Sequence, residues 1–176
     1  SLETMLGNGE QAQEFSEFIN SFATATSLSA ATIAQGVQTL LSYGVDEKAV
    51  IDTIKNLGDI SQGSASQFDS LSQTFAQVTA AGSLTESSFL EFKKLGFDPL
   101  AEISQKTGES MSALKERMKQ GKITADEVAE SLTSATSENG KFYQSLNKHS
   151  ETFAGVSARI SNFEEDLKAS AGEGYN

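Results

Sequence analysis

Residue types that commonly build functional sites are absent or scarce in this chain. The 176 residues include no cysteine, one proline and one histidine, His149. Without cysteine the chain can form neither a disulfide nor a thiolate metal site. Cysteine content therefore does not indicate whether the protein works in a reducing or an oxidising compartment. A histidine-based metal site would need carboxylate partners, and no His-Glu-x-x-His or similar spacing is present. Nucleophilic catalysis also lacks its usual signals, because there is no cysteine and no serine lies in a Gly-x-Ser-x-Gly turn.

Positive charge is scarce in the N-terminal half. The formal net charge is −11, and only Lys48 and Lys55 precede residue 88. An acidic surface repels phosphate backbones, so we expect no nucleic-acid binding through this chain. The lysines between residues 93 and 122 are interleaved with carboxylates, which predicts a solvated face of mixed charge. No apolar run approaches the roughly 20 residues of a membrane span, and no signal peptide is visible. The sequence begins at Ser1, and we expect it to be an excised fragment.

Regularly spaced glycines organise residues 82–121. They lie 12 to 14 residues apart, at Gly82, Gly96, Gly108 and Gly121. Each follows about two to three turns of helix-compatible sequence, where a left-handed residue would end a helix. The spacing therefore predicts short helices that end at glycines, and no phosphate-binding glycine loop matches.

Capping signals follow the glycines. Thr85 and Thr124 each follow an apolar residue and precede another at the fourth position, which predicts an N-cap with a hydrophobic staple. Asp46 repeats the pattern between Val45 and Val50. Thr124 and Glu127 form a capping-box motif, and Pro99 after Asp98 predicts proline at the first helical position.

Apolar residues recur at helical spacing through the first 81 residues. The first face comprises Phe15, Phe18, Ile19 and Phe22, followed by two helices that we expect to end at Gly44 and Gly58. A Gly/Ser-rich loop and a fourth helix, ending at Gly82, come next. The following helices expose on one side Phe89, Phe92, Leu95, Leu100, Ile103, Leu114, Met118, Val128 and Leu132. Helices this short are marginal alone, so we expect them to pack orthogonally on one another.

A heptad pattern marks the C-terminal part. It runs through Phe142, Leu146, His149, Phe153, Val156, Ile160, Phe163 and Leu167. Such a helix would extend roughly 40 Å. Two interpretations stay open: a long helix lying across the core, or a coiled-coil stem through which the chain oligomerises. His149 is interpreted as a polar residue on the seam that sets register or binds a neighbour. The acidic run 164–166 is interpreted as a solvated helix face.

The ordered landmarks together resemble a known family. They are Gly44 ending a helix, LTESSF after Gly82, LGFDPLAEISQKTG, QGKITADEV, and a closing segment that ends NFEEDL. From about Phe15 to Leu167 they resemble the globular region of tail tape-measure proteins of tailed phages and prophages. The resemblance implies a long, largely helical parent chain that fills the tail tube, sets tail length, and leaves through the tube at infection.

One tetrad suggests an enzyme. Glu86-Ser87-Ser88-Phe89 is similar to the motif that carries the catalytic glutamate of lytic transglycosylases. The rest of that enzyme's groove-forming sequence is missing, and a catalytic acid needs a burying pocket to raise its pKa. We therefore interpret Glu86 as a favourable charge at a helix N-terminus.

The sequence thus predicts an all-α, non-enzymatic structural protein. We expect a compact bundle of about eight to nine short, glycine-punctuated helices with a longer C-terminal helix. The expected division is a flexible lead-in at 1–9, an orthogonal helical domain at 10–140, the long helix at 141–168 and a frayed end at 169–176. No catalytic, cofactor-binding or metal-binding residue is predicted, and no cofactor.

The resemblance also implies location and partners. The expected partners are the tail tube protein, tail assembly chaperones and tail-tip or baseplate proteins, with a possible homo-oligomer through the C-terminal helix. The expected location is the lumen of the virion tail tube, after synthesis in the bacterial cytoplasm. A rival interpretation is a helical interaction module that docks a chaperone or tail-tip protein, and a wall-degrading enzyme is a more distant one.

Overall fold

The chain folds into helices joined by short turns. The computed structural model describes residue 2 and residues 9–147, and in this part eight helices and no strand occur. The helices are α2 (Gly9–Ala25), α3 (Ala30–Ser42), α4 (Glu47–Ser61), α5 (Ala65–Ala81), α6 (Glu86–Lys94), α7 (Pro99–Thr107), α8 (Met111–Lys119) and α9 (Ala125–Thr136). This confirms the predicted all-α class.

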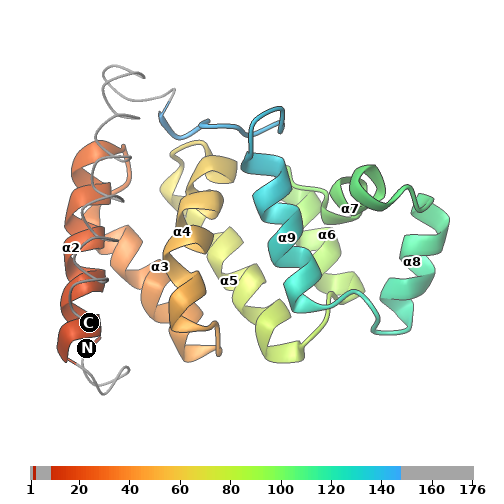
Figure 1. Ribbon diagram of the computed structural model, residues 1–176, viewed down its shortest axis with the longest axis horizontal. Helices are drawn as coiled ribbons and strands as arrows, with labels where there is room; N and C mark the ends of the chain where they lie inside the picture. The colour runs from red at the N-terminus through yellow and green to blue at the C-terminus, as the bar shows by residue number, and fades with distance from the viewer. Residues whose placement is uncertain (1, 3–8, 148–176) are drawn as a thin grey trace, which may run out of the picture.

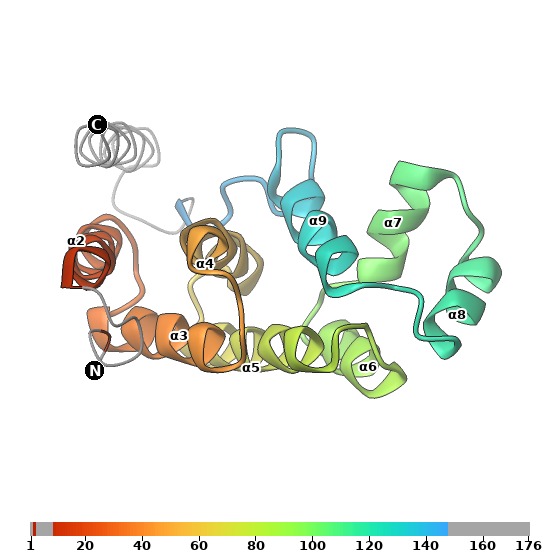
Figure 2. The ribbon, with the colours of Figure 1, turned by 60° about the horizontal axis from the view of Figure 1, so that its bottom comes forward.

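The helices form an elongated, two-layered bundle. In Figure 1, α2 lies at one end of the molecule and α8 at the other. The turned view shows α3, α5 and α6 in one layer, with α2, α4 and α9 above them (Figure 2). One buried apolar cluster receives side chains from all eight helices, and its largest fully buried members are Phe68, Phe92 and Phe97. Among the residues described, no helix has the length and apolar character that crossing a membrane requires.

The short helices begin and end where the sequence predicts. Thr85 Oγ1 accepts a hydrogen bond from the Ser88 amide at 3.1 Å, and Asp98 Oδ1 accepts one from the Ala101 amide at 2.9 Å. Such N-caps satisfy amides that have no partner inside the helix. Gly82 ends α5 with φ of 81°, a left-handed conformation that costs glycine little because it lacks a Cβ atom.

The predicted end of the third helix is wrong. Helix α4 continues through Gly58 to Ser61, and its C-cap is Gln62, with φ of 55°. Gly58 is buried inside the helix, where a Cβ atom would lie 2.9 Å from Leu146 Cδ2. This glycine therefore serves close packing against a distant segment and does not end a helix.

Residues 141–147 form turns, where the long C-terminal helix is predicted to begin. Gln144 has a positive φ of 51°, which a continuous α-helix excludes. Phe142 and Leu146 are nonetheless buried, and the Leu146 amide donates to Asp59 Oδ1 at 3.1 Å. This segment thus closes the core beside α4. The rest of the predicted C-terminal helix, including His149, lies outside the described residues, as do the predicted frayed end at 169–176 and most of the predicted lead-in. The last residue of that lead-in, Gly9, already belongs to α2.

Two helix junctions pair across the sequence. The Leu84 amide donates to the Ile123 carbonyl at 2.8 Å, and the Ala125 amide donates to the Gly82 carbonyl at 3.2 Å. Ser83 and Thr124 are therefore opposed in an isolated antiparallel bridge. These hydrogen bonds connect the α5–α6 junction to the α8–α9 junction. Helices α6, α7 and α8 lie in the sequence between the two paired junctions.

Candidate functional site

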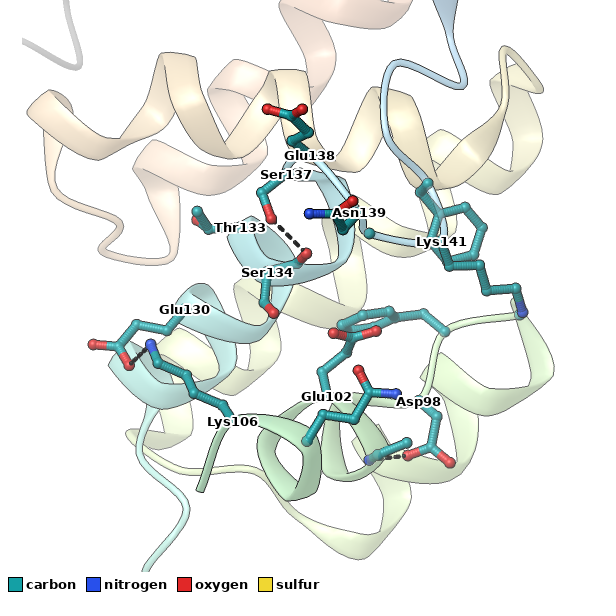
Figure 3. Close-up of a pocket in the computed structure, with 16 residues that line it drawn as sticks. Asp98, Glu102, Lys106, Glu130, Thr133, Ser134, Ser137, Glu138, Asn139 and Lys141 are labelled. Carbon is teal, nitrogen blue, oxygen red and sulfur yellow. Dashed lines mark hydrogen bonds and ion pairs between the residues drawn. The ribbon is translucent and has the colours of Figure 1, made fainter. Parts of the chain in front are cut away.

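A groove lies between α7, α9 and the segment 137–142 that follows α9. Its volume is about 920 Å³, within the range of roughly 300–1,000 Å³ that small-molecule sites occupy. Two of the lining residues, Lys106 and Glu130, bridge α7 to α9, because their charged groups lie 3.2 Å apart. Figure 3 shows polar side chains along both walls.

The α7 wall of the groove follows from local sequence. Asp98, Ala101, Glu102 and Gln105 recur at intervals of three, one and three residues, so they share one face of a helix. Phe97 and Leu100 hold the helix to the core, as both are at most 1 % exposed. The α7 wall is therefore the solvent face of an amphipathic helix.

The α9 wall repeats the same arrangement. Glu130, Thr133, Ser134 and Ser137 recur at the same intervals. The chain then turns at Asn139, whose φ is 75°, and Phe142 returns to donate its amide to the Ala135 carbonyl at 2.8 Å. Beyond the ion pair between Glu130 and Lys106, this wall carries only small hydroxyl side chains, which leave the groove open.

Carboxylates outnumber cations along the groove. Its lining includes Asp98, Glu102, Glu130 and Glu138 but only two cations, Lys106 and Lys141. The Lys106 ammonium pairs with Glu130, and the Lys141 ammonium lies 5.2 Å from the centre of the Phe142 ring. No group of three metal-ligating side chains that could hold an ion occurs in the described ranges.

A second charged cluster is centred on Arg117, near the end of α8. Its guanidinium donates to Glu109 at 3.0 Å and to Glu127 at 2.8 Å, and it also donates to the Lys122 carbonyl at 3.3 Å. The hydrogen bond that Arg117 donates to Glu127 is the main cause that raises the pKa of Arg117 above its usual value. The Glu127 carboxylate thus accepts from Arg117. Of the predicted capping box, only the hydrogen bond from the Glu127 amide to the Thr124 hydroxyl is present, at 3.1 Å. The ion pair between Arg117 and Glu127 thus links α8 to α9.

Glu86 lies outside the groove. It is the first residue of α6, is exposed, and stands in the first turn where a carboxylate favours the helix N-terminus. Sequence reasoning singled out Glu86 but missed the groove, whose lining carries no catalytic or binding motif. The one available signal was the shared spacing of polar residues on two amphipathic helices, α7 and α9, which is ordinary for solvent faces.

Comparison with models of protein families shows which family this chain belongs to. A family model described as "Tape measure protein" matches residues 1–171. The chain belongs to the tape measure protein family. The family resemblance expected from the ordered landmarks is therefore confirmed, and this tape measure chain is a structural protein of the phage tail. Searches of curated proteins and of solved structures each found no significant match.

Proposed function

We propose that this segment acts, without catalysis, in tail length determination and tail assembly. The observation that carries the proposal is the family match over residues 1–171, which covers nearly the whole chain. The fold supports it, because the described helices use their apolar residues in one core and place their charges on solvent faces. On this proposal the parent chain lies in the lumen of the tail tube, after synthesis in the bacterial cytoplasm. Its partners are the tube protein, assembly chaperones and tail-tip proteins.

Geometry constrains how such a segment could measure length. A compact folded chain of this size has a radius of gyration of about 16 Å, which corresponds to a mean diameter of about 40 Å. As one continuous helix, 171 residues would reach roughly 260 Å. Each residue of the folded form therefore accounts for much less tail length than a residue of a continuous helix. We infer that the segment unravels before it is packed in the tube, and that the short helices ending at glycines make unravelling easier. The alternative is that the segment stays folded at one end of the parent chain.

Tail length in a phage with residues 1–171 deleted in frame tests the proposal. Unravelling predicts tails shortened by roughly 260 Å, whereas a folded segment predicts a loss of about 40 Å. Complete tails of unchanged length would contradict any part in length determination.

The second candidate function is an interaction module, and the groove between α7 and α9 favours it. Such a module would leave tail length unchanged on deletion and would reduce assembly instead. The wall-degrading alternative has less support, because Glu86 is exposed and lines no described groove. Loss of cell-wall hydrolysis in a folded Glu86→Gln variant would be needed to keep it.

A further inference from the structure

The groove between α7 and α9 has an excess of negative charge that the described part of the chain does not neutralise. Lys106 is already paired with Glu130, so its positive charge is not available to the other carboxylates. Asp98 caps α7 by accepting a hydrogen bond from the Ala101 amide at 2.9 Å. Glu102 and Glu138 form no ion pair within residues 9–147. Glu102 is half-buried and extends from α7 into the space between the helices (Figure 3).

The distribution of these carboxylates favours an extended occupant over an ion. They come from the start of α7, its middle and the segment after α9, and they do not gather into a group that could hold a metal, as far as the described residues go. Between them the walls offer the amide group of Gln105 and the hydroxyl group of Ser134. Such groups can hydrogen-bond a peptide backbone, and the small hydroxyl side chains leave room for it.

We propose that this groove binds a short basic segment of a partner protein, with an arginine or lysine directed at Glu102. An arginine suits the site best, since its guanidinium can bind a carboxylate through two parallel hydrogen bonds. A volume of about 920 Å³ accommodates one such side chain together with the residues that flank it. Nucleic acid is the wrong occupant, because phosphates would meet the same carboxylates.

The test uses a blocked pentapeptide of alternating arginine and alanine, titrated into the chain at low salt. Binding is followed by the backbone amide signals in two-dimensional nuclear magnetic resonance spectra. We expect the largest shifts at residues 98–106 and 130–142. The double variant Glu102→Gln with Glu138→Gln is expected to raise the Kd for the peptide about tenfold, because each ion pair near the surface contributes up to about fivefold to the affinity.

A matched variant separates specific binding from attraction to the net charge of −11. Asp52→Asn with Asp69→Asn removes the same charge from exposed positions on α4 and α5 that do not line the groove, and we expect less than a twofold change. Circular dichroism must show equal helix content and equal melting for both variant pairs. An unfolded groove variant would be replaced by Glu102→Gln alone, for which about fivefold weakening is expected.

Several results would overturn the proposal. They are equal weakening by the two variant pairs, shifts located away from the groove, or no binding of the peptide at low salt. A concentration-dependent mass that the groove substitutions abolish would show that a second copy of the chain fills the groove instead. The proposal goes beyond the tape role and does not rest on it: tails of unchanged length would remove that role and leave the peptide result standing.

Discussion

Replacing Arg117 by methionine is expected to destabilise the fold by about 2 kcal/mol. Methionine retains much of the apolar stem of arginine but removes both ion pairs. The two pairs are short, at 3.0 and 2.8 Å, and the side chains of Glu109 and Glu127 are 34 % and 20 % exposed. Hydrogen bonds to charged groups contribute about 1.5–3 kcal/mol, and fully exposed pairs about 0.2–1 kcal/mol. These half-buried pairs lie between the two, at about 1 kcal/mol each.

Lys106→Met is the matched control for this prediction. Lys106 also pairs with a carboxylate and also joins two helices, but its side chain and that of Glu130 are 58 % and 62 % exposed. We therefore expect a loss of under about 0.5 kcal/mol. In a chain of this size, 1 kcal/mol corresponds to about 2–4 °C in Tm, so thermal circular dichroism should show a drop of about 4–8 °C for Arg117→Met and under about 2 °C for Lys106→Met. Equal shifts in the two variants would refute the reasoning that burial and double pairing set the contribution of Arg117.

Two further predictions concern close packing and extension. Gly36→Ala should destabilise the fold by about 1 kcal/mol in urea titrations, because the new Cβ atom would lie 2.8 Å from the ring of Phe68 and overpacking exceeds the gain in helix propensity. Gly58→Ala should cost less, since its 2.9 Å contact is a leucine methyl group at the end of a flexible side chain, and the reverse order would contradict this account. Ser83 and Thr124 are opposed in the antiparallel bridge, so the double variant Ser83→Cys with Thr124→Cys can form a disulfide between them. This disulfide should block unravelling, and hence tail assembly, until a reductant is added. Full-length tails from the oxidised protein would contradict unravelling.

The local features of this fold could be predicted from the sequence. Helix ends at Thr85, Asp98 and Gly82 depend on hydrogen bonds and backbone angles within about four residues, so short motifs contain the necessary information. The apolar faces were predictable for the same reason, because a helix repeats every 3.6 residues.

Features that join distant segments could not be predicted in this way. Gly58 has the sequence context of a helix end, but the approach of Leu146 determines its role. The pairing of Leu84 with Ile123 joins residues 39 positions apart, and only the similar strings Gly-Ser-Leu-Thr and Gly-Lys-Ile-Thr hint at it. The groove depends on where α7 lies relative to α9, which no local motif records. Its lining residues therefore resemble ordinary solvent faces in the sequence.

Tail length, measured in electron micrographs of phage whose tape measure gene carries residues 1–171 deleted or duplicated in tandem, tests the central claim most directly. The duplication keeps one intact copy, so it separates length determination from a general failure of assembly. We predict tails shorter by roughly 260 Å after the deletion and longer by the same amount after the duplication. Complete tails of unchanged length in both phages would contradict a part for this segment in length determination.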